Sequence, residues 1–383
     1  MRRIILLILC CVMLVGCAFA DEPVTLRLYE IDARTSFLKN HPNLKVVDVS
    51  GDPFGSKVKL LKSENCPDAL MLRTASDDFQ ALRRAGLLND LSSSDEITRI
   101  ICRMPHWVQY EVVSEYGHIY GLPILHHIYP FHWNREAWKA AGLSREDAPQ
   151  SYAELLDFLE KWIENPVDTV CISHLTRWNT GTAKYNYCYW LMEFLLQSWE
   201  MQQRYAQEGV DFNHRELIAL AERTRTVGLA LYKAEPRNKS KLPELFENCL
   251  NGMGYPVQDY GMSCTIPMRI TEDQPALCKA SMSIAVIPSS SAHPEEALLL
   301  LEDYARVQWK INYTLFMDYQ PDAFDNNTVT QGWLNDYWNY NGTFVYFPTV
   351  FNEHRNGQTS KEGLLMKFFE GKISAEQLAK ELI

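Results

Sequence analysis

The sequence predicts an α/β fold, and its 383 residues are enough for two domains. Three short segments, at 24–28, 45–49 and 68–73, have the alternation or the continuous apolar character of β-strands. Segments with helical signals separate them. Strands and helices that alternate at this spacing form a parallel sheet covered by helices.

The segment after the third strand has the signals of a helix. Asp77 or Asp78 is placed to cap its first turn, and Gly86 suits the left-handed turn that follows a helix. Two further segments, 119–123 and 128–133, have an extended pattern. We therefore expect the alternation of strands and helices to continue past residue 100.

The second half of the chain predicts several more helices. Residues 151–154 and 374–377 both have the capping-box pattern, in which two side chains bond to each other's backbone amides. The segment 183–232 is rich in long apolar side chains and is expected to form two or three helices. An apolar strand is expected at 283–287, and a helix is expected to start at His293-Pro294, because proline favours the first helical position.

The first twenty residues have the pattern of an export signal. The apolar run Ile4–Val15 is too short to span a bilayer, and a basic start precedes it. Leu14-Val15-Gly16-Cys17 resembles a bacterial lipobox, so we expect an extracytoplasmic protein attached to the membrane through a lipid on Cys17. The alternative is cleavage after Ala18-Phe19-Ala20, which would release a soluble secreted or periplasmic protein.

Composition excludes several classes of partner. The formal charge is −11, so nucleic acid and anionic membrane surfaces are poor partners. Seven cysteines follow the signal without a C-x-x-C pair, which favours scattered buried thiols over a zinc site, with room for one or two disulfides. We expect a monomer without a cofactor.

Several segments in this order resemble one family, the extracellular solute-binding proteins of ATP-driven (ABC) importers, in particular the maltose-binding-protein-like sugar binders. The resemblance covers most of the chain and rests on these segments: His41-Pro42-Asn43-Leu44-Lys45-Val46, Cys66-Pro67-Asp68-Ala69-Leu70-Met71-Leu72, Gly86-Leu87-Leu88-Asn89-Asp90-Leu91, Tyr120-Gly121-Leu122-Pro123, Trp133-Asn134, Ile287-Pro288-Ser289-Ser290-Ser291, Pro294-Glu295-Glu296-Ala297 and Phe369-Glu370-Gly371-Lys372-Ile373-Ser374.

The resemblance implies a type II periplasmic-binding-protein fold of two lobes, each a mainly parallel sheet flanked by helices. A hinge of several strands joins the lobes, which close over a solute. The implied division gives 1–20 to the signal, 21–123 with 288–345 to the N-terminal lobe, and 124–287 with 346–383 to the C-terminal lobe. The chain is expected to cross between lobes after Pro123, before Pro288 and near 346–350.

Aromatic residues are the first candidates for a sugar site, because rings cover the C–H faces of sugars while polar groups bind the hydroxyls. One cluster belongs to the C-terminal lobe and a second lies in a segment rich in Asn and Gly; rings packed under loops are the alternative. Two further tyrosines flank a Gly-rich stretch. The candidates are Trp178, Tyr185, Trp190, Trp333, Trp338, Tyr340, Tyr255 and Tyr260.

Strand ends supply the other candidates. Ligands of parallel sheets bind beyond the carboxyl ends of the strands, which indicates Arg73, Asp77 and Asp78 after the third strand. Arg73 can hydrogen-bond a hydroxyl or a carboxylate. Asp78 is equally suited to cap the following helix.

A metal site gains little support from the histidines. His126, His127 and His132 lie close in the sequence, but neighbours on a strand point to opposite faces, so His126 and His127 do not easily share one ion. No metal is expected.

Catalytic signatures do not occur. The sequence lacks G-x-S-x-G, H-E-x-x-H, the P-loop and the dinucleotide fingerprint. The resemblance implies the substrate-binding lipoprotein of an ABC importer, which captures a small solute, a carbohydrate by preference, and delivers it to the permease subunits. The alternatives are a cell-surface glycan-degrading enzyme and a ligand-sensing receptor domain.

Overall fold

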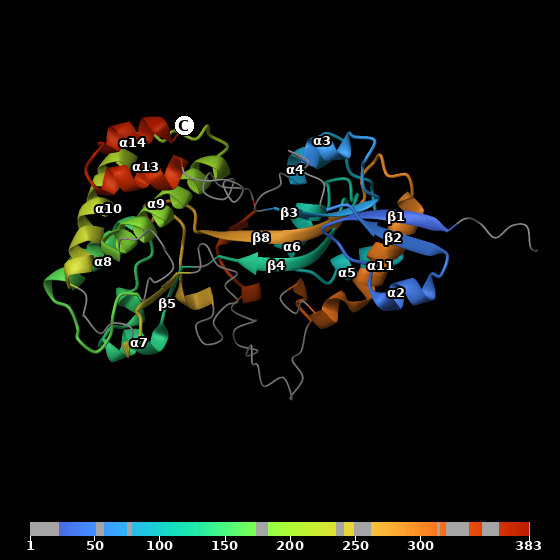
Figure 1. Cartoon of the computed structure of the whole chain (residues 1–383). Helices are drawn as coiled ribbons and strands as arrows, with labels where there is room; N and C mark the ends of the chain where they lie inside the picture. The colour runs from blue at the N-terminus through green and yellow to red at the C-terminus, as the bar shows by residue number, and fades with distance from the viewer. Residues whose placement is uncertain are drawn as a thin grey trace, which may run out of the picture.

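The computed structural model describes residues 23–50, 57–74, 79–129, 131–173, 183–234, 241–248, 262–311, 315–318, 337–346 and 360–382. These residues form two lobes that lie side by side in Figure 1. Each lobe has its own hydrophobic core. One core contains side chains from Leu26 to Ile128 and from Cys278 to Tyr346, and we call its surroundings the N-terminal lobe. The other, in the C-terminal lobe, contains side chains from Phe131 to Leu277 and from Val345 to Leu382.

The N-terminal lobe is built on a sheet with strand order β2-β1-β3-β8-β4, and β9 also pairs with β8. Its strands are β1 (Val24–Tyr29), β2 (Leu44–Asp48), β3 (Ala69–Arg73), β4 (Leu122–Ile128), β8 (Leu277–Val286) and β9 (Thr343–Val345). As the sequence predicts, β1 is parallel to both β2 and β3. Strand β8 is antiparallel to β3 and β4, so the sheet is mixed.

Helices cover both faces of this sheet. Figure 1 shows α3 and α4 on one side and α2, α5 and α11 on the other. The helices of this lobe are α2 (Thr35–Asn40), α3 (Lys57–Leu61), α4 (Phe79–Arg84), α5 (Asp95–Ile101), α6 (His106–Val112) and α11 (Pro294–Ile311). Gly86 has φ +67° and its amide bonds to Arg83, which confirms the predicted turn after α4.

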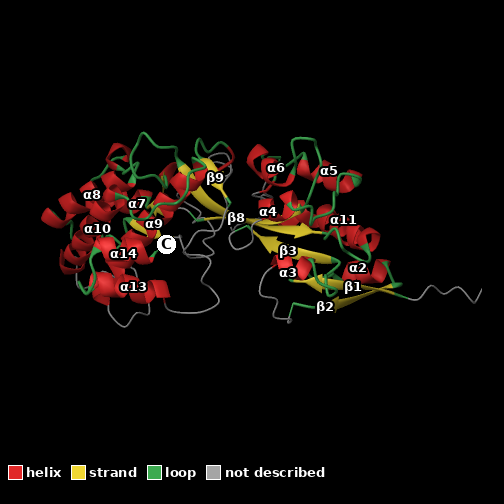
Figure 2. Ribbon diagram, turned by 90° about the horizontal axis from the view of Figure 1, so that it is seen from above, coloured by secondary structure: helices red, strands yellow, loops and turns green. Residues whose placement is uncertain are grey.

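The C-terminal lobe is mainly helical. Its described strands β5 (Phe131–Trp133), β6 (Phe246–Asn248) and β7 (Thr265–Ile266) form an antiparallel sheet, so the mainly parallel sheet expected for this lobe is wrong within the described residues. The helices are α7 (Arg135–Ala140), α8 (Tyr152–Glu164), α9 (Asn186–Tyr205), α10 (Arg215–Ala234), α13 (Ser360–Phe369) and α14 (Ala375–Glu381). Figure 2 shows these helices gathered in one lobe.

Helix α9 forms the centre of this lobe. Every residue from Tyr187 to Gln202 is buried, and a helix that is covered all round must lie inside a domain. It packs against α10 at Gly228, where an added Cβ would lie 2.7 Å from the backbone nitrogen of Cys188. Glycine is required there because the two helix backbones approach so closely.

Three strands carry the chain between the lobes. Between Ile128 on β4 and Phe131 on β5 the side chains change from the N-terminal to the C-terminal core. The same change occurs between Leu277 and Cys278 on β8, which is ten residues before the predicted crossing at Pro288. Strand β9, which is parallel to β8, makes the same change: Phe344 packs in the N-terminal core and its neighbour Val345 packs in the C-terminal core.

Of the two predicted capping boxes, one is complete and the other is half formed. Ser374 and Gln377 form the complete reciprocal pair at the start of α14. At α8, Ser151 Oγ accepts the Glu154 amide at 3.3 Å, but the Glu154 carboxylate accepts from the Gln150 amide at 2.6 Å. The reciprocal half of that prediction is wrong, because the amide one residue earlier lies within reach.

Two remaining expectations concern thiols and membranes. The structure describes six of the seven cysteines that follow the signal, and Cys249 lies outside the described residues. All six are free thiols, and four of them are buried: Cys171, Cys188, Cys264 and Cys278. Within the described ranges, no helix is both long enough and apolar enough to cross a membrane.

Candidate functional site

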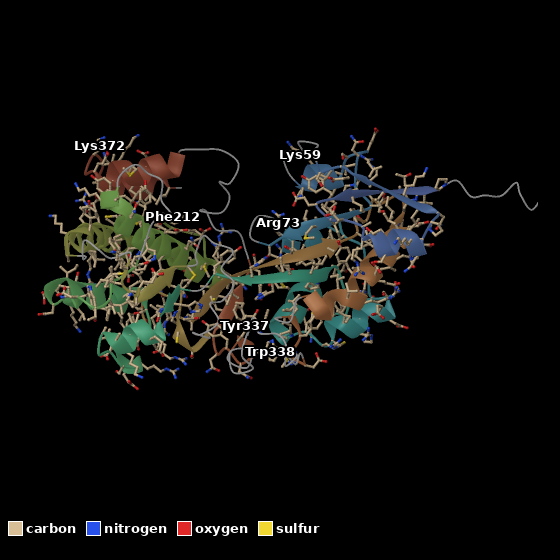
Figure 3. All side chains as sticks on the ribbon, turned by 60° about the horizontal axis from the view of Figure 1, so that its bottom comes forward. Lys59, Arg73, Phe212, Tyr337, Trp338 and Lys372 are labelled. Carbon is tan, nitrogen blue, oxygen red and sulfur yellow. The ribbon has the colours of Figure 1, made fainter. Side chains whose placement is uncertain are left out.

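Three strands of the N-terminal lobe end at one edge of the sheet, towards the C-terminal lobe. Strands β1 and β3 are parallel, and β4 runs in the same direction because both β3 and β4 are antiparallel to β8. Glu30 follows β1, Arg73 ends β3, and His127 lies at the end of β4. We call these residues, with Lys57 of α3, the carboxyl edge. Figure 3 shows Arg73 on the part of the N-terminal lobe that faces the C-terminal lobe.

Glu30 lies between two cations of the carboxyl edge. Its Oε2 is 3.5 Å from Arg73 Nη2, and its Oε1 is 3.6 Å from Lys57 Nζ. The side chains of Arg73 and Glu30 are 58% and 32% exposed, so these groups can reach a solute. The Lys57 ammonium also lies over the Tyr29 ring, 3.8 Å from its centre. This cation–π contact stabilises the ammonium in that position.

His127 brings a neutral imidazole to the same place. Burial lowers the pKa of His127, and the positive charge of Arg73 lowers it further. A neutral imidazole offers one hydrogen-bond donor and one acceptor. The carboxyl edge therefore offers a guanidinium donor, carboxylate acceptors and an imidazole, which is a set suited to a solute with many hydroxyl groups, while the covered Lys57 ammonium supports Glu30 from behind.

More than half of the predicted site residues lie outside the part of the chain that the structure describes. Asp77, Asp78, Trp178, Tyr255, Tyr260 and Trp333 all lie outside the described residues, as does Cys17. Their participation stays a prediction. The five predicted residues that the structure describes are Arg73, Tyr185, Trp190, Trp338 and Tyr340.

Two of the predicted aromatic residues lie inside the C-terminal lobe. The Trp190 ring is fully buried and stacks on Phe131 with ring centres 5.1 Å apart. Tyr185 is 8% exposed and stacks on Phe369 at 6.2 Å. In this arrangement both rings pack in the core. Neither exposes enough surface to stack on a sugar. Their position on α9 and just before it explains the aromatic density of this segment of the sequence.

Trp338 and Tyr340 have a different environment. Both are half-buried against the N-terminal core, and Figure 3 shows Trp338 beside Tyr337 at the boundary of the two lobes. The Trp338 indole N–H and the Tyr340 hydroxyl are covered but have no hydrogen-bond partner among the described residues. Unsatisfied buried donors cost free energy, so a partner such as a ligand hydroxyl would be favourable. The contacts of the described residues do not join either residue to Arg73.

The histidines considered for a metal have separate surroundings. His126 is buried on β4 between two hydroxyls: its Nδ1 contacts the Tyr337 hydroxyl, and its Nε2 lies 3.0 Å from that of Tyr346. His132 is buried on β5 with Nδ1 3.1 Å from Thr265 Oγ1. Among the described residues, no group of three potential ligands could hold a metal ion.

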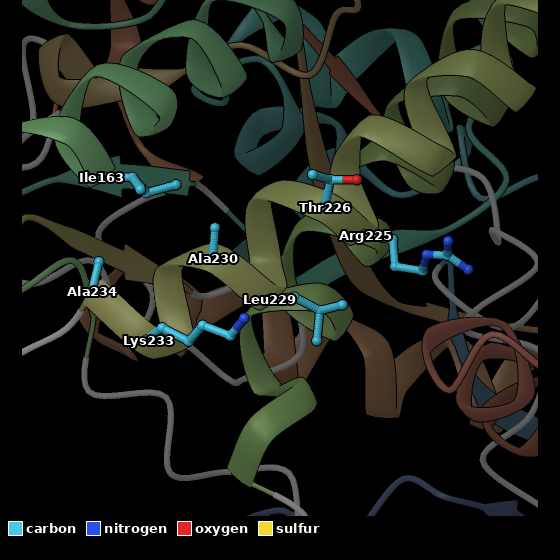
Figure 4. Close-up of a pocket in the computed structure, with 7 residues that line it drawn as sticks. All are labelled: Ile163, Arg225, Thr226, Leu229, Ala230, Lys233 and Ala234. Carbon is cyan, nitrogen blue, oxygen red and sulfur yellow. The ribbon is translucent and has the colours of Figure 1, made fainter.

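The C-terminal lobe carries a surface hollow between α8 and α10. Its volume is about 550 Å³, and Figure 4 shows the side chains around it. The lining residues are Ile163, Arg225, Thr226, Leu229, Ala230, Lys233 and Ala234. None of the predicted site residues is among them.

Sequence reasoning missed three residues of the carboxyl edge. Glu30, Lys57 and His127 were not predicted, although Glu30 directly follows a predicted strand. Arg73 is predicted by the rule that ligands bind beyond the carboxyl ends of strands, and this rule applies equally to Glu30. Lys57 and His127 gave no comparable signal, since their contacts depend on how separate elements pack.

The fold and the carboxyl edge define a two-lobed α/β binding protein. The sequence profile of the bacterial extracellular solute-binding proteins matches residues 22–302. The chain belongs to this family, which works outside the cytoplasm. Among curated protein sequences, none is significantly similar to this chain.

Solved structures share the fold. A sugar transporter from Bacillus licheniformis in complex with stachyose has a TM-score of 0.55 at 15% identity, with 94% of this chain and 98% of that chain covered. The solute-binding protein RafE in complex with raffinose gives 0.53 at 14% identity, covering 94% and 97%. A protein described in work on xylan utilization by Caldanaerobius polysaccharolyticus gives 0.52 at 14% identity, covering 94% and 99%.

Proposed function

We propose that this solute-binding protein captures a carbohydrate between its lobes and delivers it to the permease of an ABC importer. The carrying observation is the ion-paired group of Glu30 and Arg73, at strand ends that face the other lobe, with Lys57 of α3 beside them. Charged donors and acceptors in one place suit the hydroxyl groups of a sugar. Structures of this fold hold raffinose and stachyose, so the fold accommodates oligosaccharides.

The crossing strands support lobe closure. We propose that the lobes are divided at 129–130, at Leu277-Cys278 and within β9, which moves the first two boundaries relative to the sequence expectation. Closure requires that the solute make contacts in the closed state that the open state lacks. Arg73 and His127 would contact it from the N-terminal lobe. The side chains of the C-terminal lobe that contact it include, in this proposal, the predicted Trp178 and Tyr255.

Two further parts of the proposal concern the membrane anchor and the fate of the solute. A lipid on Cys17 would hold the protein at the cell membrane next to the permease, with simple secretion as the alternative. A protein acting in this way binds one solute as a monomer and releases it unchanged. Membership of a solute-binding family favours this over the glycan-degrading and receptor alternatives.

A thermal-shift screen of residues 21–383 tests the proposal. Raffinose, stachyose, mannotriose and xylo-oligosaccharides would be compared with amino acids, dipeptides and polyamines. A binder of neutral oligosaccharides shows a raised Tm with one of the sugars, since a ligand at 100 times its Kd contributes about 2.7 kcal/mol. A shift only with peptides or polyamines would contradict the carbohydrate assignment, and appearance of new reducing ends would favour the enzyme.

A further inference from the structure

We infer that Glu30, itself anchored by the covered Lys57 ammonium, is a positioning residue that holds the Arg73 guanidinium in place for the solute. The inference rests on the proposed function of the carboxyl edge and extends it to a residue that does not itself need to contact the ligand. Three observations carry it: the bridging ion pairs, the unusual backbone of Glu30, and the loop that fixes this backbone.

The ion pairs join separate elements of the fold. Each carboxylate oxygen of Glu30 faces a different cation, at 3.5 Å from Arg73 Nη2 and 3.6 Å from Lys57 Nζ. Arg73 comes from the end of β3 and Lys57 from the start of α3. Without the carboxylate, the two cations would repel one another at the edge of the sheet. Glu30 thus links the exposed Arg73 to the covered Lys57, two cations from different elements.

The backbone of Glu30 has a conformation that most side chains avoid. Its φ is +55°, in the left-handed region. Only Glu30 and Gln207 have positive φ among the described residues other than glycine. A left-handed residue with a Cβ is strained, and such strain is found repeatedly at ligand clamps. Glycine would adopt this conformation without strain, so a glutamate here indicates a use for its side chain.

The neighbouring loop fixes this conformation. The Glu30 amide donates to Ser50 Oγ at 2.6 Å, and the Ser50 amide donates to Asp48 Oδ1 at 2.8 Å. The side-chain hydrogen bond from Ser50 lowers the pKa of the Asp48 carboxyl. The end of β2 therefore holds the turn after β1, and this turn directs the Glu30 side chain towards Arg73.

The exposure of these groups argues against a purely structural role. Arg73 is 58% exposed and Glu30 is 32% exposed, and ion pairs at such positions contribute little to folding. Oriented donors at a binding site have a different value, because a group that is already placed loses less freedom when the ligand binds. The arrangement suits preorganisation better than it suits stability.

The first test needs no solute. Protein labelled with ¹⁵N-arginine would be studied by NMR, with the Arg73 Nε–H signal assigned through Arg73→Lys. Glu30→Gln keeps the size of the side chain and removes its charge, and it should raise the mobility of the Arg73 side chain on the nanosecond timescale. Glu96→Gln is the matched control, because Glu96 pairs with Arg99 at 2.6 Å with similar exposures of 24% and 57%. Unchanged Arg73 mobility in Glu30→Gln would overturn the inference.

The second test is a double-mutant cycle on binding, with raffinose as the probe. Glu30→Gln should weaken binding about tenfold, a loss typical of one charge-assisted hydrogen bond. In the Arg73→Gln background the same substitution should add less than twofold, because the group that Glu30 positions is absent. Additive losses would contradict positioning through Arg73. If the wild-type protein binds no sugar, the proposed function fails while the NMR result still decides the inference.

A third variant separates strain from function. Glu30→Gly relieves the left-handed strain, so its Tm should be equal to or higher than that of the wild type, while its affinity for raffinose should fall as in Glu30→Gln. A lowered Tm together with unchanged Arg73 mobility would assign Glu30 a structural role instead.

Discussion

Lys279 Nζ donates to Gln197 Oε1 at 2.8 Å, and both side chains are buried where β8 passes from one lobe to the other. Gln197 in turn donates to Glu193 Oε1 at 2.8 Å, so a chain of polar groups connects the crossing strand to the central helix α9. Lys279 is paired in register with Val345 of β9, and its carbonyl accepts the Tyr129 amide. One buried lysine therefore lies beside all three connections between the lobes.

Replacement of Lys279 by methionine tests the value of this chain. The substitution keeps most of the length of the side chain and leaves Gln197 and Glu193 buried without the cation. We expect the free energy of unfolding in urea to fall by about 3 kcal/mol, as when one partner of a buried charged pair is removed. Lys241→Met, at an exposed position, is the control and should change it by less than about 0.5 kcal/mol. Equal effects of both variants would show that the buried chain contributes nothing.

The close contact of α9 and α10 gives a second prediction. In Gly228→Ala the new methyl group would lie 2.7 to 2.8 Å from Cys188, so the helices must separate. Overpacking of this kind destabilises by about 2 kcal/mol. In Gly363→Ala the methyl group of α13 meets nothing within 4 Å, and the variant should be more stable by up to about 1 kcal/mol. Chemical denaturation compares the two, and a tolerated Gly228→Ala would show that this helix contact is looser than described.

The buried His132 predicts a dependence of stability on pH. Burial lowers its pKa from 6.5 to about 4, although a hydrogen bond with the Cys264 backbone opposes the shift. Between these values the unfolded chain binds a proton that the folded protein does not, so this contribution to stability is complete above pH 6.5 and declines as the pH falls towards 4. The full effect is about 3 kcal/mol.

His132→Gln removes the titrating group while retaining polar atoms. Urea unfolding at pH 7 and pH 4.5 should show a loss of stability on acidification that is about 2 kcal/mol smaller in the variant than in the wild type. The same loss in both proteins would show that His132 is protonated in the folded state at pH 4.5.

Two tryptophans predicted for one site should behave differently. Trp190→Ala empties a fully buried site and is expected to destabilise by about 3–5 kcal/mol. Trp338→Ala removes a half-buried ring whose N–H has no partner, and it should weaken raffinose binding about tenfold at a smaller cost in Tm. Calorimetry and thermal unfolding of both variants decide this. Unchanged affinity in Trp338→Ala would remove that residue from the site.

The N-terminal lobe could largely be predicted from the sequence. Strands β1, β2 and β3 and the turn at Gly86 depend on local alternation, continuous apolar runs and glycine, all of which are visible in a short window. The extent of β8 could not be predicted, because its ten residues are all buried and include Lys279 and two serines, which are polar residue types. Their burial depends on partners that are distant in the sequence, such as Gln197.

The candidate site was less predictable. Arg73 is predicted from a general rule about strand ends, and its part in binding stays a prediction. The aromatic cluster that predicts Trp190 as a site residue lies in a core in the structure, because composition does not distinguish a ring that lines a cleft from one that fills a core. The role of Lys57 depends on α3 packing beside β1, which no local pattern encodes.

Native mass spectrometry of the protein, with the sugar that gives the largest thermal shift, tests the central claim most directly. The account predicts one intact sugar bound per monomer, and the same sugar recovered unchanged after the protein is unfolded. Absence of a bound sugar, or recovery of cleaved fragments, would contradict it.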